Sequence, residues 1–306
     1  MKPSSYLLFA ASDLQLARDN HDREPIRSAL PRLDSQPEDT LALAQLQALR
    51  FLFYDDADSG RLALELLRAH DFGAGKVEGL AAIKRRFGWL QVMSQLRGHP
   101  DWHDSAEGYR AAIAAAPQQL EDSAAGDLLR ALWLAVVALA AGILLEDDAS
   151  FQSAVSFYRR VVDQHIHPEG FFKGMVDVDG ARKTYQAQFA ATGALALMSE
   201  MARQAGEDLW SYNNRAVSAN TAATYTFYYY FFPESWRWEA GLTREQTLAI
   251  MRREGAYFEM VNRRSPLRGA DELFAEQRPL FSAAAGGLTT LTHGLRPPAK
   301  KRWRLF

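Results

Sequence analysis

The sequence has no cysteine among its 306 residues. This absence excludes disulfide bonds, a thiol nucleophile and metal sites built from thiolates. It leaves the redox compartment undecided, because exported and cytosolic chains can both lack cysteine. The hydrophobic core must therefore hold the fold together, and 48% hydrophobic residues are enough for a large core in one or two domains.

The chain also has little net charge. Its formal net charge is −2 and its isoelectric point is about 6.4. No overall field attracts nucleic acid or an anionic membrane, so we expect no nucleic-acid partner. An anionic ligand would have to be held by a local cluster of cations.

Long apolar runs are missing as well. A membrane span needs roughly 18 apolar residues, and the closest segment, residues 128–145, contains Arg130 and is flanked by Asp127 and Glu146. We expect a buried helix there and no membrane span. Residues 6–11 are six apolar residues, short of the roughly 7–15 of a signal peptide. We interpret this N-terminus as part of the mature fold or as an expression start that replaces a leader.

Helical periodicity dominates what the sequence does contain. Apolar residues recur three and four positions apart, and glycine or proline ends most of these segments. Residues 171–180, with three glycines and no helical period, are predicted to be a loop or a short hairpin. The pattern predicts helices over residues 12–30, 37–54, 62–69, 76–97, 101–116, 120–145, 151–166, 182–204, 209–232 and 243–262.

Short connections between these segments favour antiparallel helix hairpins. No change of composition marks a linker, so residues 1–306 are expected to form a single domain, with residues 295–306 as an extended basic tail. The predicted fold class is all-α, an incomplete (α/α) toroid or barrel of antiparallel helix hairpins. A helical-repeat solenoid is also compatible with the pattern, although no fixed period supports it.

Residues 206–238 are the most informative stretch of the chain. They enclose a dense aromatic run, residues 225–231, followed by Arg237 and preceded by the cations Arg182 and Lys183. Aromatic rings stack on the faces of sugar rings while cations hold carboxylates, so this composition suits an anionic sugar chain. Aromatic residues at helical spacing also form a core, and both interpretations stay open.

Four motifs occur in an order that resembles alginate-lyase-type polysaccharide lyases, which have an α/α toroid fold. The resemblance runs from about Leu41 to Gly294. Each motif alone is weak, and their order gives the resemblance its specificity. The motifs are a turn at Val162–Gly170, a helix at Arg182–Phe189, the segment Gly206–Tyr212 and the segment Pro233–Trp238.

The resemblance implies cleavage of a uronic-acid polymer by β-elimination, with no cofactor. In this reaction a cation or neutral donor offsets the charge of the C6 carboxylate, so that the C5 proton becomes acidic. A base removes that proton and an acid protonates the departing oxygen. The partner is then an anionic polysaccharide or oligosaccharide. The resemblance also implies a periplasmic or secreted protein, whereas the weak N-terminal signal argues against export.

Tyr185 and Arg182 are the candidate catalytic pair. They are three residues apart on a predicted helix, which places both side chains on one face. A nearby cation lowers the pKa of a phenol, so that Tyr185 could act as both base and acid. The alternative is a surface cation beside a partly buried tyrosine.

The chain departs from the family at one motif. The family's Asn-Asn-His-x-x-Trp corresponds here to residues 128–133, where Trp133 is retained and the amides and the histidine are replaced. Arg130 could still neutralise a carboxylate. Either the chemistry uses other groups, or the protein is a non-catalytic glycan-binding or polysaccharide-assembly protein on the same fold. A third interpretation, a helical interaction scaffold, predicts no aromatic cleft.

The remaining candidates complete the predicted site. His293 follows the Gly286-Gly287 loop and could replace the missing base, although a loop histidine is often structural. Arg263 ends a helix, where it could line the groove or simply complement the helix dipole. Gln188 belongs to the second motif. The predicted substrate-binding residues are Tyr229, Trp236, Trp238, Gln188 and Arg263.

Metal and nucleotide chemistry are not expected. His165 and His167 form a His-x-His pair with Asp163 and Glu169 as the nearby acidic residues, and turn residues exposed to solvent explain them better than metal ligands. The Gly286-Gly287 loop does not follow a predicted strand, so it is not a phosphate-binding loop.

Overall fold

The computed structural model describes residues 5–72, 79–105, 113, 127–176 and 184–297. Helices dominate this part of the chain, and its two short strands pair as one antiparallel hairpin. The elements are α1 Ala11–Asp19, α2 Ile26–Ala29, η1 Leu30–Asp34, α3 Thr40–Tyr54, α4 Ala57–Ala69, α5 Leu80–Leu96, η2 Pro100–Ser105, α8 Leu128–Leu145, α9 Asp148–Gln164, η3 Lys173–Met175, α10 Thr184–Gln204, α11 Ala219–Phe231, η4 Pro233–Ser235, α12 Arg244–Glu254, α13 Tyr257–Arg264, α14 Ala270–Gln277, β1 Phe281–Ser282, β2 Gly287–Leu288 and α15 Thr289–His293.

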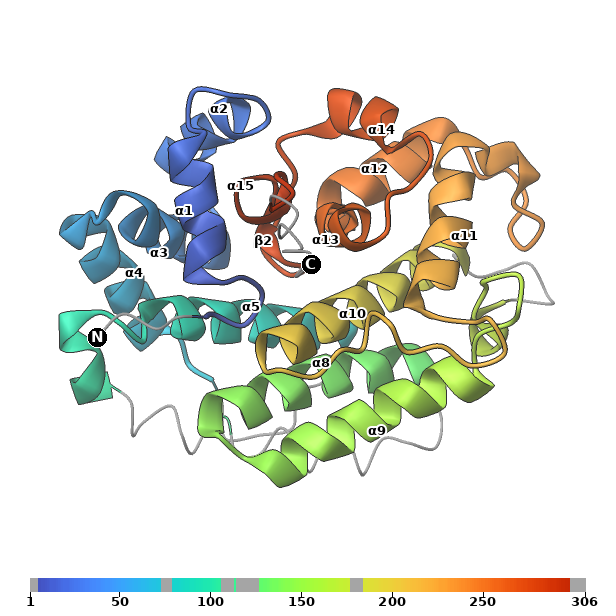
Figure 1. The fold of residues 1–306 in the computed structure, drawn as a ribbon, viewed down its shortest axis with the longest axis horizontal. Helices are drawn as coiled ribbons and strands as arrows, with labels where there is room; N and C mark the ends of the chain where they lie inside the picture. Colours follow the sequence, from blue (N-terminus) through green and yellow to red (C-terminus); the bar gives the residue numbers. More distant parts are fainter. Residues whose placement is uncertain (1–4, 73–78, 106–112, 114–126, 177–183, 298–306) are drawn as a thin grey trace, which may run out of the picture.

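The helices follow one another around an open arc (Figure 1). Helices α1 to α4 lie at one side, α8 and α9 at the bottom, and α11 to α14 at the other side, with α15 and the β-hairpin in the middle. Consecutive helices α3 and α4, and α8 and α9, pack closely as pairs. This arrangement confirms the predicted all-α toroid class.

Helices α8 and α10 run in the same direction. The indole N–H of Trp133, in the second turn of α8, donates to the carbonyl oxygen of Ala190, in the second turn of α10, at 3.2 Å. At their other ends, Gly142 of α8 and Ala205, just after α10, line one pocket. The first turns of both helices therefore lie at the same end of the molecule.

Helix α8 is long and apolar enough to cross a membrane by length and composition. It packs instead against α5, α9 and α10, and two thirds of its residues (67%) are buried inside the molecule. A helix that is apolar on most sides is typical of a buried position in a helical protein. The expectation of a buried core helix fits this packing.

Side chains cap most of the long helices. A cap oxygen accepts a hydrogen bond from a backbone N–H that has no partner within the helix. Asp39, expected from the sequence to open its helix, caps α3 by accepting from the N–H of Ala42 at 2.8 Å. Caps of this kind stand at Asp39, Asp56, Asp127, Asp147, Ser218 and Thr243.

The prediction of one helix over residues 209–232 is wrong in its first half. Helix α11 begins only at Ala219, and the segment before it is a loop with a turn at Arg215 and Ala216, both at positive φ. The two aromatic side chains of this loop, Trp210 and Tyr212, form hydrogen bonds with neighbouring helices. The indole N–H of Trp210 donates to Glu200 at 2.9 Å, and the hydroxyl of Tyr212 donates to Asp163 at 3.0 Å.

The prediction of one helix over residues 243–262 is also wrong. The chain breaks at Gly255 into α12 and α13. A Cβ atom at Gly255 would come within 2.6 Å of the carbonyl oxygen of Met251, so only glycine fits this close turn. The break places Arg253 and Glu254 at the free end of α12.

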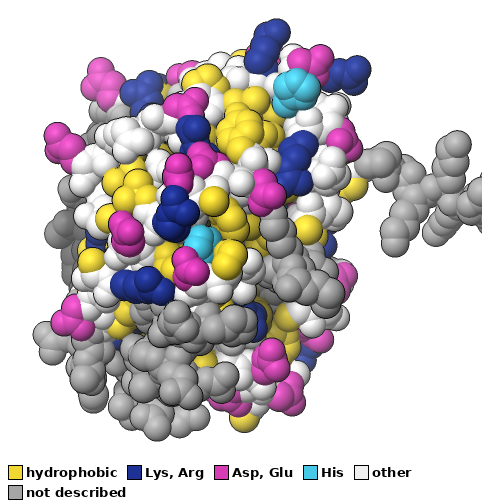
Figure 2. Space-filling model, turned by 90° about the vertical axis from the view of Figure 1, so that its left-hand side faces the viewer, with side chains coloured by type: hydrophobic (Ala, Val, Ile, Leu, Met, Phe, Trp, Pro, Cys, Tyr) yellow, Lys and Arg dark blue, Asp and Glu magenta, His cyan; other side chains and the backbone are white. Residues whose placement is uncertain are grey.

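Acidic and basic side chains are interspersed over the face shown in Figure 2, with no large patch of either sign. This distribution agrees with the small net charge of the sequence. Any binding of a charged polymer must depend on local clusters.

Candidate functional site

A pocket of about 160 Å³ lies between the first turn of α10 and one side of α12. We call it the α10–α12 pocket. It combines two side-chain amides, one carboxylate and one guanidinium over an apolar floor. Its lining residues are Gln186, Glu239, Leu242, Gln246, Ala249, Ile250 and Arg253.

Backbone contacts hold the polar groups of this pocket in place. Glu239 accepts a hydrogen bond from the backbone N–H of Tyr185 at 3.3 Å, at the N-terminal end of α10, where a negative charge is favourable. Gln246 accepts from the N–H of Thr243 at 2.8 Å as part of the capping box of α12. Its NH₂ group is therefore presented from a fixed position.

A chain of charges leads from this pocket into the molecule. Arg253 is paired with Glu254 at 3.0 Å, and Glu254 is paired with Lys84 of α5. The Lys84 ammonium lies 4.7 Å from the centre of the Trp133 ring, a distance at which the ring attracts the cation. The Arg253 side chain is 56% exposed, whereas those of Lys84 and Glu254 are about 10% exposed (11% and 10%). Of the two cations in this series of ion pairs, Arg253 is therefore the one that a ligand can reach.

Tyr185 does not open on this pocket. Its side chain is fully buried, and its hydroxyl donates to the carbonyl oxygen of Thr226 at 3.2 Å. The ring packs against Phe189 and Trp236. Burial raises the pKa of the phenol well above its ordinary value, which disfavours the phenolate that a base requires. The phenol that was expected to be accessible is therefore closed to solvent in this structure, and its predicted partner, Arg182, lies outside the described residues.

Gln188 is a structural residue rather than a sugar contact. It is 1% exposed, and its amide forms two hydrogen bonds with the backbone of Phe172, accepting from the N–H at 2.8 Å and donating to the carbonyl at 3.0 Å. This clamp fixes the loop after α9 against α10. Gln188 therefore cannot reach a substrate without releasing that loop.

The three predicted stacking rings differ in accessibility. Trp236 is buried, and its indole N–H donates to Thr184 at 2.9 Å, so it is a core residue. Tyr229 is half-buried and packs edge-on against Trp236 at 4.8 Å. Trp238 is half-buried too, and the guanidinium of the exposed Arg237 lies 4.5 Å from its ring centre. Of the predicted stacking rings, Trp238 is thus the one beside an exposed cation, whereas the most exposed rings of this segment are Tyr228 and Phe232.

Arg263 and His293 are also buried. Arg263 is paired with Asp13 at 2.5 Å and donates to the carbonyl oxygen of Thr292 at 2.9 Å. The ring of His293 lies 3.0 Å from the carbonyl oxygen of Leu8. Both residues join the N-terminal segment to the last helices. Arg263 was predicted to bind substrate and His293 to replace the base, and their burial leaves neither side chain open to a polymer in this structure.

The polar side chains near His293 form a cluster around the carboxylate of Glu200. Glu200 is completely buried, and it accepts from Trp210, Arg203 and Arg264 while lying 3.5 Å from His293. Burial alone would raise the pKa of its carboxyl, but the hydrogen bond and charge of His293, followed by the hydrogen bonds of Arg203 and Arg264, hold that pKa well below the usual range. The cluster stabilises the fold at the far end of α10.

Arg130 lies in the first turn of α8 and is partly buried. It therefore belongs to the same end of the molecule as Thr184, at the beginning of α10. No group of three or more metal-binding side chains comes together among the described residues. His167, one of the pair excluded as metal ligands, stacks on Phe171 with the ring centres 4.4 Å apart.

Sequence reasoning missed Gln186, Glu239 and Arg253. A signal for Gln186 was present in α10, where Tyr185, Phe189 and Thr192 follow helical spacing and mark a buried face. The next residue along the helix turns by about 100° and leaves that face. The positions of Glu239 and Arg253 depended on how the loop after η4 and the end of α12 fold, which periodicity does not give.

The comparisons with known proteins agree with this architecture. The alginate lyase family profile matches residues 38–236. A comparison with curated proteins finds no match. A solved structure of a histidine-to-alanine variant of alginate lyase A1-III, in complex with a tetrasaccharide, has a TM-score of 0.73 at 14% identity, covering 98% of this chain and 97% of that one.

Two further solved structures are similar. Alginate lyase A1-III from Sphingomonas species A1 has a TM-score of 0.66 at 17% identity, covering 91% of this chain and 79% of that one. An alginate lyase from Bacteroides ovatus has a TM-score of 0.69 at 13% identity, covering 96% of this chain and 100% of that one. These likenesses show the α/α toroid fold. Because the family profile covers about two thirds of the sequence, the chain belongs to the alginate lyase family.

Proposed function

We propose that this protein binds an anionic, uronate-containing polysaccharide at the α10–α12 pocket. The observation that carries the proposal is the composition of that pocket: an exposed guanidinium, Arg253, beside the amides of Gln186 and Gln246. Guanidinium groups bind carboxylates with charge-assisted hydrogen bonds, and amides bind sugar hydroxyls. Trp238 with Arg237 supplies a ring and a second cation next to Glu239 along the chain.

Binding without cleavage has the stronger support. Residues 128–133 lack the amides and the histidine of the family motif. Tyr185 and His293, the candidate proton-transfer groups among the described residues, are buried and hydrogen-bonded to backbone carbonyls. A buried phenol with a raised pKa is a poor base, so Tyr185 and His293 cannot serve the proton transfers of β-elimination from these positions.

Cleavage by β-elimination is the second candidate, and the family match favours it. In that case Arg253 would offset the carboxylate charge, and Glu239, a carboxylate lining the same pocket, would accept the C5 proton. The leaving oxygen would take its proton from water or from another group of the site.

One pair of measurements separates the two candidates. Calorimetric titration with oligomers of alginate, hyaluronan, pectate and glucuronan measures binding, and the ultraviolet absorbance of an unsaturated uronate product measures elimination. Binding of one of these polymers with no rise in absorbance supports the first candidate. A rise in absorbance that Glu239→Gln abolishes supports the second, and an absence of both signals contradicts the proposal.

A further inference from the structure

Helix α12 ends in two residues of opposite charge, Arg253 and Glu254, beside the α10–α12 pocket. The two oxygens of the Glu254 carboxylate have different partners. Its Oε1 accepts from the Arg253 guanidinium at 3.0 Å, and its Oε2 accepts from the Lys84 ammonium of α5 at 2.5 Å. One carboxylate therefore lies between two cations, and of these two Arg253 is the one that lines the pocket.

The Lys84 ammonium is held firmly at this position. Both side chains of its ion pair with Glu254 are nearly buried, and charges interact more strongly there than in water. The ammonium also lies 4.7 Å from the centre of the Trp133 ring, which attracts it. Trp133 is fixed in turn by its hydrogen bond to the carbonyl oxygen of Ala190. Trp133 therefore helps to keep Lys84 on Glu254.

The position of Arg253 is restricted as well. Its carbonyl oxygen accepts from the hydroxyl of Ser282 in β1 at 2.7 Å. Its guanidinium donates to Oε1 of Glu254 through two nitrogens, Nε at 3.1 Å and Nη2 at 3.0 Å. A ligand carboxylate must compete with Glu254 for this guanidinium. The strength of that competition depends on how far Lys84 offsets the charge of Glu254.

The balance of charge around the pocket depends on Lys84. Arg253 and Glu239 both line the pocket, and Glu254 adds a second carboxylate next to Arg253. Without Lys84, two carboxylates would face one guanidinium, and an excess of negative charge repels a polyanion. With Lys84 the four side chains balance, so the charge of Arg253 is available to a ligand.

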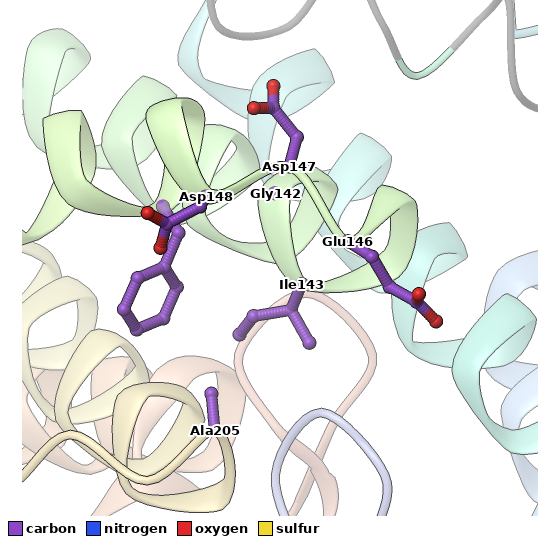
Figure 3. A pocket seen from close by; sticks show the side chains of 7 residues that line it. Gly142, Ile143, Glu146, Asp147, Asp148 and Ala205 are labelled. Atoms are coloured by element: carbon purple, nitrogen blue, oxygen red, sulfur yellow. The ribbon is translucent and has the colours of Figure 1, made fainter.

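A pocket between α8 and α9 lacks this balance (Figure 3). Its volume is about 280 Å³, and the charged residues that line it, Glu146, Asp147 and Asp148, are all acidic. An anionic polymer is not attracted to such a site. The α10–α12 pocket differs because it has a guanidinium in its lining and an ammonium on the far side of Glu254.

We propose that Lys84 gives the α10–α12 pocket its affinity for carboxylates, because it offsets the charge of Glu254 and so leaves the Arg253 guanidinium able to bind one. This inference rests on the proposed function and adds the residue that makes the pocket select anionic over neutral sugar chains. Lys84 acts through Glu254 and Arg253, so it is a positioning residue and not a ligand contact.

Calorimetric titration of the full chain with oligouronates provides the first test. Lys84→Met keeps an apolar side chain on Trp133 but removes the charge, and we expect binding about fivefold weaker. Lys84→Met/Glu254→Gln removes the carboxylate as well and should recover affinity to within about twofold of the original chain. The matched control is Arg85→Gln. It removes the neighbouring cation of α5, which pairs with Asp39 and does not line the pocket, and should bind as the original chain does.

The double variant separates an effect of charge from a loss of structure. If Lys84 only supported the packing, Lys84→Met/Glu254→Gln would bind no better than Lys84→Met, because it loses a further charged group. That result would overturn the proposal, and so would equal affinities of Lys84→Met and the original chain. Thermal unfolding establishes that each variant is folded during the titration. Lys84→Gln removes the same charge and keeps a hydrogen-bond donor, so it replaces Lys84→Met if that variant does not fold.

A second measurement needs no polysaccharide. Phenylglyoxal modifies uncharged guanidino groups, and a paired carboxylate slows the reaction because it favours the charged form. Mass spectrometry of the modified full chain compares Arg253 with its exposed neighbour Arg252. In Lys84→Met we expect modification about threefold slower at Arg253 and unchanged at Arg252. An unchanged rate at Arg253 would overturn the inference. The expected rates without binding of any oligouronate would support the effect of Lys84 on Arg253 and contradict the proposed function.

Discussion

The hydroxyl of Tyr185 donates to the carbonyl oxygen of Thr226 inside the core, 3.2 Å away. This hydrogen bond joins α10 to α11 at the position where the sequence resemblance placed a catalytic phenol. The resemblance is correct at the level of family and fold. The Tyr185 side chain, however, lies on the buried face of α10 and does not reach solvent. In this position the phenol contributes to the packing of α10 against α11.

Tyr185→Phe should weaken the fold without affecting ligand binding. The substitution removes one buried hydrogen bond and keeps the ring, which costs about 1 kcal/mol of the free energy of unfolding. Urea denaturation measures this change, and calorimetry measures the affinity for the polysaccharide. A loss of affinity with unchanged stability would mean that the phenol reaches the ligand.

Glu200→Gln should destabilise the protein more than Tyr185→Phe does. The variant removes the buried carboxylate that the partly exposed Arg203 and Arg264 share, and the loss of a charged hydrogen-bond partner costs about 1.5–3 kcal/mol. Glu65→Gln, at an exposed position of α4, is the control and should change stability by less than about 0.5 kcal/mol. Equal unfolding midpoints for the two variants would refute this account of the cluster.

The same cluster predicts a dependence of stability on pH. The pKa of the Glu200 carboxyl is lower in the folded state than the ordinary value of about 4.3 in an unfolded chain. Its contribution is therefore complete above that value and is lost as the pH falls below about 4. Denaturation curves between neutral and acidic pH should show this loss in the original chain, and a smaller loss in Glu200→Gln.

Gly142→Ala tests the packing of the α8–α9 turn. A Cβ atom at this position would lie 2.9 Å from the backbone nitrogen of Phe151, so the turn must shift. Such overpacking costs about 1–3 kcal/mol. Gly174→Ala is the matched control, since the nearest atom to its new Cβ, on Leu128, is 3.9 Å away. Thermal unfolding should separate the two variants, and equal midpoints would contradict the packing argument.

The sequence was sufficient for the fold class and for several helix ends. Helices α3 and α12 begin close to the predicted residues 37 and 243, because the side chains of Asp39 and Thr243 accept from backbone groups only three residues away. The long apolar helix was recognisable as core from composition alone. These features depend on local chemistry, which one sequence contains in full.

The irregular loop before α11 and the burial of the candidate site residues could not be predicted, because they depend on contacts between distant segments. The loop before α11 resembles a helix in its composition, but Trp210 and Tyr212 bind to α10 and α9 and hold it in an irregular path. Arg263 pairs with Asp13, 250 positions earlier in the chain, and no local pattern reports such a partner. The burial of Tyr185 and His293 could not be predicted for the same reason, because the whole fold decides whether a particular phenol or imidazole is buried.

The binding of oligouronates to two neighbouring arginine variants tests the central claim most directly. Arg253 lines the α10–α12 pocket, whereas Arg252 is exposed on α12 and does not line it. Calorimetric titration should show that Arg253→Gln weakens binding about fivefold, or ~1 kcal/mol, while Arg252→Gln binds as the original chain does. Equal affinities for the two variants would contradict the assignment of this pocket as the polysaccharide site.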